Sequence, residues 1–139
     1  MLNKTLLIIF LFIFTSLGSV LPNKNKTPGN VDPCVTIVWV CNHFTDSSYP
    51  LFKNIKAAYR NYGIDINDKR YSLNHLIPMN LGGTNEISNL WPMMNIDFYF
   101  KKKIEENIFH CVCYGFITLK EAQYILRTDW TSWKIDSFK

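Results

Sequence analysis

The sequence contains no hydrophobic run long enough to cross a bilayer comfortably. Its most apolar stretch, from Thr5 to Leu17, has about 13 residues, whereas a membrane-spanning helix needs about 20. There is no internal repeat, and no low-complexity tract outside the polar residues 22–33, so a repeat architecture is excluded. The excess of positive charge is only +4, which permits binding to a polyanion but does not require it.

The short apolar stretch is typical of a different kind of segment. Lys4 places a positive charge before it, and the small residues Ser16, Gly18 and Ser19 lie at its end. This order is that of a secretory signal peptide. We therefore expect residues 1–19 to be removed and the mature protein to be secreted or periplasmic, without stable membrane association. An uncleaved membrane anchor is the alternative.

Cysteine is scarce, and its spacing is not that of a common zinc knuckle. The four residues Cys34, Cys41, Cys111 and Cys113 give C-x6-C and C-x-C, with no C-x2-C. An even number of cysteines in an oxidising compartment indicates disulfides, and a bond between Cys111 and Cys113 would be strained. We expect two long-range bridges that join the first two cysteines to the last two. A zinc site formed by all four thiolates is the alternative.

The mature chain of roughly 120 residues is long enough for one domain with a modest core. Its 47% hydrophobic and 15% aromatic content favours a folded chain. We predict an α+β, mainly helical fold in which residues 20–33 form a flexible leader and residues 34–139 form the domain. The β-branched run from Cys34 to Cys41 predicts a short strand, and the apolar spacing over residues 51–62 predicts a helix.

The centre of the chain predicts a hairpin followed by a helix, with residues 70–110 as its core. Residues 70–77 form the first strand, Gly82 and Gly83 mark the turn, and residues 88–92 form the return strand. Asn95 is then expected to cap a helix that runs to about His110. The side chains expected on its inner face are Ile96, Phe100, Ile104 and Ile108. A capping-box pattern at residues 118–121 predicts a last helix that ends near residue 127.

Polar residues at the ends of the predicted strands indicate a site for phosphodiester hydrolysis. Such hydrolysis needs a base that deprotonates water, and a neutral imidazole such as that of His75 suits this near pH 7. Asn89 could orient the ring through its amide oxygen, since the second ring nitrogen needs a partner. Asn74 could turn toward a divalent cation, whose role would be to neutralise charge on the phosphate.

The same residues carry a resemblance to a known family. Residues 74–83 read NHLIPMNLGG and residues 89–92 read NLWP, and His75 and Asn89 are 14 positions apart. This resembles the HNH endonuclease family, in the subgroup whose motif reads DHLIPLxLGG followed by NLWP. The resemblance extends from about Ile55 to Trp130. It implies a fold that includes a ββα-metal finger, and metal-dependent cleavage of DNA or, less expectedly, RNA.

The resemblance also implies a set of site residues. His75 and Asn89 match the first two letters of the motif, and Asn74 stands where the family has a metal-binding Asp. For the third position we favour Asp97 as a metal ligand, because it would restore the missing negative charge; Asn95 and His110 are the alternatives. Mg²⁺ is the expected cofactor, with Mn²⁺, Ca²⁺ and Zn²⁺ as alternatives. The candidates for substrate phosphates are Lys101, Lys102 and Lys103.

Three functional hypotheses follow from the sequence. The first is an exported HNH-type nuclease. The second is a related module that binds nucleic acid or has a structural role and has lost efficient metal chemistry, which the neutral Asn74 favours. The third is an exported, disulfide-bonded protein of unrelated function.

Overall fold

The computed structural model describes residues 21–43 and 50–134 of the chain. These residues form a small α+β fold with four α-helices and a two-stranded antiparallel sheet. The predicted signal peptide lies outside the described residues. Within them, no helix combines the length and the apolar character that crossing a membrane would require.

The sheet is the hairpin that the sequence predicts. Strand β1 (Tyr71–His75) pairs with β2 (Leu90–Met94) in a register that places Tyr71 opposite Met94 and His75 opposite Leu90. The connection contains two short 3₁₀ turns, η1 (Met79–Leu81) and η2 (Ile87–Asn89), rather than a single tight turn. Gly82 closes η1 at φ +85°, a left-handed conformation that favours glycine.

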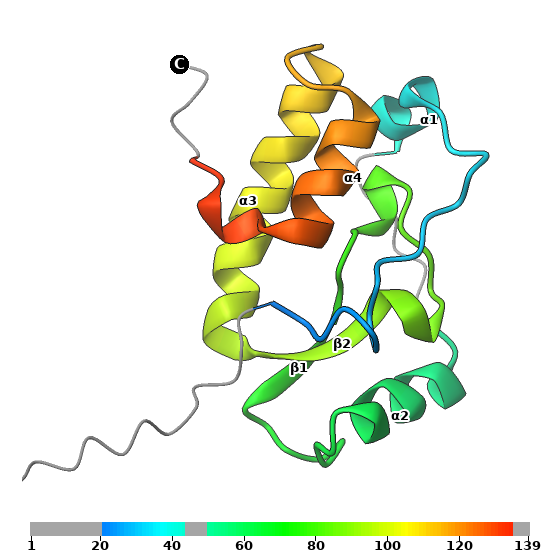
Figure 1. The fold of residues 1–139 in the computed structure, drawn as a ribbon, viewed down its shortest axis with the longest axis vertical. Coiled ribbons are helices and arrows are strands. Elements are labelled where there is room, and N and C mark those ends of the chain that lie inside the picture. Colours follow the sequence, from blue (N-terminus) through cyan, green and yellow to red (C-terminus); the bar gives the residue numbers. More distant parts are fainter. Residues whose placement is uncertain (1–20, 44–49, 135–139) are drawn as a thin grey trace, which may run out of the picture.

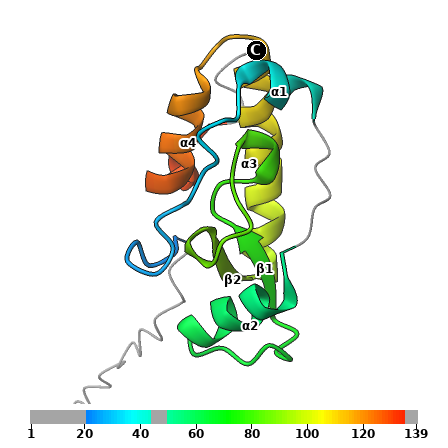
Figure 2. The same cartoon turned by 90° about the vertical axis from the view of Figure 1, so that its right-hand side faces the viewer.

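Two helices enclose the hairpin. Helix α2 (Phe52–Asn61) packs against β2, and α3 (Asn95–Cys113) follows β2 directly and contacts both strands. The hairpin lies between α2 and the first half of α3 in both views (Figures 1 and 2). Because β1, β2 and α3 are in contact, any group at the end of β1 is held close to the first turns of α3.

The second half of α3 carries the main hydrophobic core. Helix α4 (Leu119–Thr128) runs beside it, and the 3₁₀ turn η3 (Trp130–Ser132) returns to its surface (Figure 1). The predicted capping box opens α4: the Thr118 hydroxyl accepts from the Glu121 amide, and the Glu121 carboxylate accepts from the Thr118 amide. The core side chains include Trp91, Met93, Ile104, Ile108, Val112, Leu126 and Trp130.

The prediction for the inner face of α3 is only half correct. Ile104 and Ile108 are buried, but Ile96 and Phe100 are 65% and 63% exposed. Lys101 and Glu105 take the inward positions instead. Asn95 was expected to cap the helix from outside, but it is instead the first helical residue. Its side chain accepts a hydrogen bond from the Ser72 hydroxyl and donates one to the Lys69 carbonyl.

The segment from Cys34 to Cys41 is not a strand. Residues Ile37–Asn42 form a short helix, α1, whose first turn is capped by the Thr36 hydroxyl, which accepts from the Trp39 amide at 3.2 Å. The β-branched composition predicted a strand, but the described sheet has only the two strands of the hairpin, and this cap together with packing against α3 favours a helix.

Residues 21–33, expected to form a flexible leader, make specific contacts with the domain. The Gly29 amide donates to the Ser88 carbonyl at 2.9 Å, and the Asp32 amide donates to the Gly82 carbonyl at 2.9 Å. Thr27 is fully buried, and its hydroxyl donates to the Leu90 carbonyl. This segment therefore covers the hairpin connection, and the ordered unit begins before the predicted boundary at residue 34.

One of the two expected disulfides is present. Cys41 of α1 is bonded to Cys113 at the end of α3, as one of the long-range pairs allowed by the sequence. Cys34 is an exposed free thiol and Cys111 a buried one, so neither the second bridge nor the four-thiolate zinc site is formed. A structural disulfide fits an oxidising compartment.

Candidate functional site

His75 ends β1 and is the best-placed base among the described residues. Its side chain is partly buried, and its Nε2 lies 2.8 Å from Oδ1 of Asn85 in the hairpin connection. Because an amide oxygen only accepts hydrogen bonds, Nε2 carries the proton of the neutral ring. Nδ1 is then the ring atom that can accept a proton.

The environment of the ring favours its neutral form. Burial is the largest effect and lowers the pKa of His75 below its ordinary value of 6.5. The hydrogen bond to Asn85 opposes this shift, and the positive charge of Lys101 adds to it. A neutral imidazole near pH 7 is the form that a general base requires.

Asn89 does not orient the imidazole as expected. It is fully buried, and all of its hydrogen bonds go to the backbone of the hairpin connection. Its Oδ1 accepts from the Ile77 amide at 3.0 Å, while its Nδ2 donates to the carbonyls of Ile77 and Thr84, both at 2.9 Å. Asn89 therefore fixes the connection that carries Asn85, and acts on His75 only through that backbone.

The sequence analysis missed Asn85. It lies in a run of turn-forming residues, where an amide is usually a local cap, and only the folded connection brings it to the ring of His75. Its carbonyl also accepts from Nδ2 of Asn54 at 3.1 Å. Asn85 thus joins α2, the hairpin connection and the end of β1.

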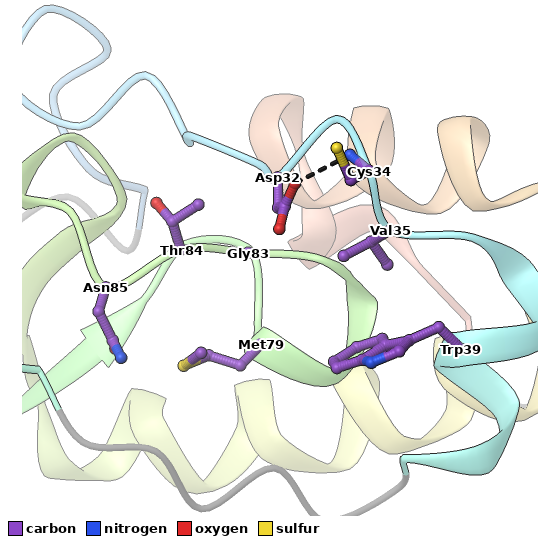
Figure 3. Close-up of a pocket in the computed structure, with 8 residues that line it drawn as sticks. All are labelled: Asp32, Cys34, Val35, Trp39, Met79, Gly83, Thr84 and Asn85. Carbon is purple, nitrogen blue, oxygen red and sulfur yellow. Dashed lines mark hydrogen bonds between the residues drawn. The ribbon is translucent and has the colours of Figure 1, made fainter.

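A pocket of about 480 Å³ borders the same connection (Figure 3). Asn85, Thr84 and Met79 form one side of it, and Asp32, Val35 and Trp39 form the other. His75 does not line this pocket, but its hydrogen-bond partner does. The pocket therefore offers a substrate group access to Asn85, the hydrogen-bond partner of His75.

Lys101 is not a surface cation. It is completely buried, and its ammonium donates to the His75 carbonyl at 2.8 Å and pairs with the Glu105 carboxylate. Burial lowers the pKa of Lys101, and the Glu105 carboxylate opposes that shift. Lys101 is thus a structural link between α3 and β1, which corrects its predicted role in binding phosphate.

The other two lysines of this run remain accessible. Lys102 is about half exposed and lies 3.3 Å from the second oxygen of Glu105, and Lys103 is exposed. Both remain candidates for contact with a polyanion.

We tested whether the predicted metal ligands fit a divalent cation. The Asn74 Oδ1 is buried and has no hydrogen-bond partner in the described part of the chain, as an unfilled ligand would. However, Asn74 is neutral and only 2% exposed, and Asp97 lines a different pocket, with Leu21, Tyr71 and Met94.

The rest of the described chain adds no stronger donor set. No group of three or more His, Cys, Asp and Glu side chains suited to a metal is found among residues 21–43 and 50–134. One amide and one carboxylate bind Mg²⁺ weakly. We therefore assign no described residue as a ligand of a divalent cation.

Comparisons with known proteins add no assignment. The chain matches no protein-family model, no curated protein and no solved structure.

Proposed function

We propose that the protein is an exported endonuclease that hydrolyses phosphodiester bonds of DNA, with RNA as the second possible substrate. The observation that carries the proposal is the geometry of His75: an imidazole at the end of β1, partly buried, whose Nε2 lies 2.8 Å from Oδ1 of Asn85. The motif that surrounds His75 in the sequence supports the same chemistry.

The chemistry assigned to His75 is general-base catalysis. Nδ1 takes a proton from water as the water oxygen attacks phosphorus, and the bond from phosphorus to the leaving sugar oxygen breaks. The leaving oxygen then takes a proton, from solvent or from the imidazolium. A divalent cation, when bound, would neutralise charge on the phosphate, but we assign no residue to hold it.

A binding module is the second candidate. It is favoured by the buried, neutral Asn74 and by the lack of an acidic donor set among the described residues. Such a module would keep the hairpin and its affinity for nucleic acid without cleaving it.

Cleavage of plasmid DNA distinguishes the two. We expect the mature protein to nick supercoiled DNA, and His75→Ala to lower the rate by a factor of about 10²–10⁴, the usual contribution of a general base. Exposed Lys120, on α4, provides the control, and Lys120→Ala should retain activity.

Each reaction is run with Mg²⁺, with Mn²⁺ and with EDTA, and RNA is tested in parallel. Binding without cleavage under every condition would support the module. Equal activity of wild type and His75→Ala would rule out the assigned base.

A further inference from the structure

The outward face of α2 is a row of cations without acidic neighbours on the same helix. Lys53, Lys56 and Arg60 are all exposed and recur at spacings of three and four, so they lie on one side of the helix. Ala58 and Tyr59 are buried on the other side. Helix α2 contains no Asp or Glu.

Further contacts extend and order this row. At its start, the ammonium of Lys56 lies 4.7 Å from the ring centre of Phe52. At its end, Lys26 from the N-terminal segment donates to the Asn61 carbonyl at 2.6 Å and lies over the Tyr62 ring. Four cations from two segments are therefore aligned along α2.

The described carboxylates near this row form no ion pair with its cations, although Asp65 borders the same pocket as Lys56 and Arg60. Asp68 is paired with Arg70 at 2.7 Å, and Asp65 accepts hydrogen bonds from Asn67. Glu86 is exposed at the start of η2. In the described part of the chain, no carboxylate forms an ion pair with a cation of the row on α2.

The row is connected to the candidate site. Asn54, on α2, donates to the backbone of Asn85, and the Asn85 side chain holds the ring of His75. Two successive hydrogen bonds therefore connect α2 to the proposed base.

We propose that Lys53, Lys56, Arg60 and Lys26 form the surface that binds the sugar-phosphate backbone of the nucleic acid. This inference rests on the proposed function, and it assigns the main phosphate contacts to α2 rather than to the predicted run on α3. From Lys53 to Arg60 the helix rises about 10 Å, which matches about three phosphates of one strand at roughly 3.4 Å each.

An anionic membrane is the less suitable partner for this face. A helix that lies on a bilayer presents its apolar side to the lipid, whereas Ala58 and Tyr59, opposite the cations of α2, are buried, and Phe52 is the large apolar side chain of α2 that is exposed. The charges that face outward suit an extended polyanion.

The test measures binding of the full mature chain to labelled duplex and single-stranded DNA in EDTA, by fluorescence anisotropy over a range of salt. The variant combines Lys53→Gln, Lys56→Gln and Arg60→Gln. The control, Lys69→Gln with Lys120→Gln and Lys134→Gln, removes the same charge from exposed positions outside α2. Circular dichroism confirms that both triple variants are folded.

We expect the α2 variant to weaken binding on the order of 10–100-fold, and to reduce the slope of log K against log salt by about 2–3. The control should change affinity less than about threefold. Equal losses in both variants, or no binding by the wild type, would overturn the proposal. So would unchanged DNA affinity with lost binding to phosphatidylserine vesicles.

The outcomes separate this inference from the nuclease proposal. If the wild type binds DNA through α2 but does not cleave it, the proposed binding surface stands and the nuclease proposal is wrong. If the wild type cleaves DNA and the α2 variant does so with the same KM, the nuclease proposal stands and the proposed binding surface is wrong.

Discussion

His75 combines two features that a surface histidine would not have: one ring nitrogen fixed by an amide, and enough burial to disfavour its charged form. Both follow from its position at the end of a strand covered by the hairpin connection. Burial, the larger of the two effects, lowers the pKa of His75 below its ordinary value of 6.5.

The pH profile of cleavage should report this lowered pKa. We expect kcat/KM to decrease as the pH falls and His75 becomes charged, with the midpoint of this decrease below pH 6.5. The folded state resists this protonation more than the unfolded state, so stability should also fall as the pH decreases through the same range. Half-loss of activity at or above 6.5, with the fold intact by circular dichroism, would contradict the assignment.

Asn89 shows why a motif residue can be recognised while its role is misjudged. The sequence places it 14 residues after His75 and suggests a direct contact. In the structure, its three side-chain hydrogen bonds satisfy backbone groups inside the connection. Buried backbone amides and carbonyls need such partners. The contact to the ring comes from Asn85, which no local pattern distinguishes from an ordinary turn residue.

At the scale of elements, the sequence predicted best where local signals are strong. The start of α4 follows from its capping box, and the paired strands follow from alternation and from Gly82. The connection also needs Gly83, because a Cβ there would lie 1.8 Å from the Ile77 carbonyl oxygen. Helix α1 was missed because its cap and its packing against α3 outweigh its β-branched composition.

Periodicity also failed on α3, for a physical reason. A buried Lys–Glu pair takes the place of two apolar side chains, so an apolar pattern cannot identify the inner face. This pair holds α3 against the end of β1 through the His75 carbonyl. The position of the candidate base relative to α3 therefore depends on an interaction that hydrophobic spacing does not reveal.

Removing one partner of this pair should be costly. We expect Lys101→Met to destabilise the fold by about 3 kcal/mol, the low end for a broken buried pair, because Lys102 still reaches Glu105. Adding Glu105→Leu should recover most of the loss, since no unpaired charge then remains buried. Urea denaturation measures both, with Lys103→Met as the exposed control, expected to change stability by less than about 0.5 kcal/mol. A double variant no more stable than Lys101→Met would argue against charge burial as the cause.

At the scale of the whole molecule, contacts between distant segments enclose the hairpin. The N-terminal segment covers the connection, and Arg127 of α4 donates to the Gly29 carbonyl at 2.9 Å. The Cys41–Cys113 bond joins α1 to the end of α3 across 72 residues, and that interval contains α2, both strands and His75. His75 and Asn85 thus lie inside the covalent loop that this bond closes.

Loss of this bond should therefore destabilise the whole domain and not only α1. The chain-entropy model gives about 4 kcal/mol for a loop of this size, because the unfolded chain regains freedom that the bond removes. We expect Cys41→Ser, or reduction of the wild type, to lower the guanidinium midpoint by a corresponding amount in one cooperative transition. The exposed Cys34 supplies the control, since Cys34→Ser changes a thiol but no covalent loop. If reduction left the midpoint unchanged, the bond would not constrain the fold around His75.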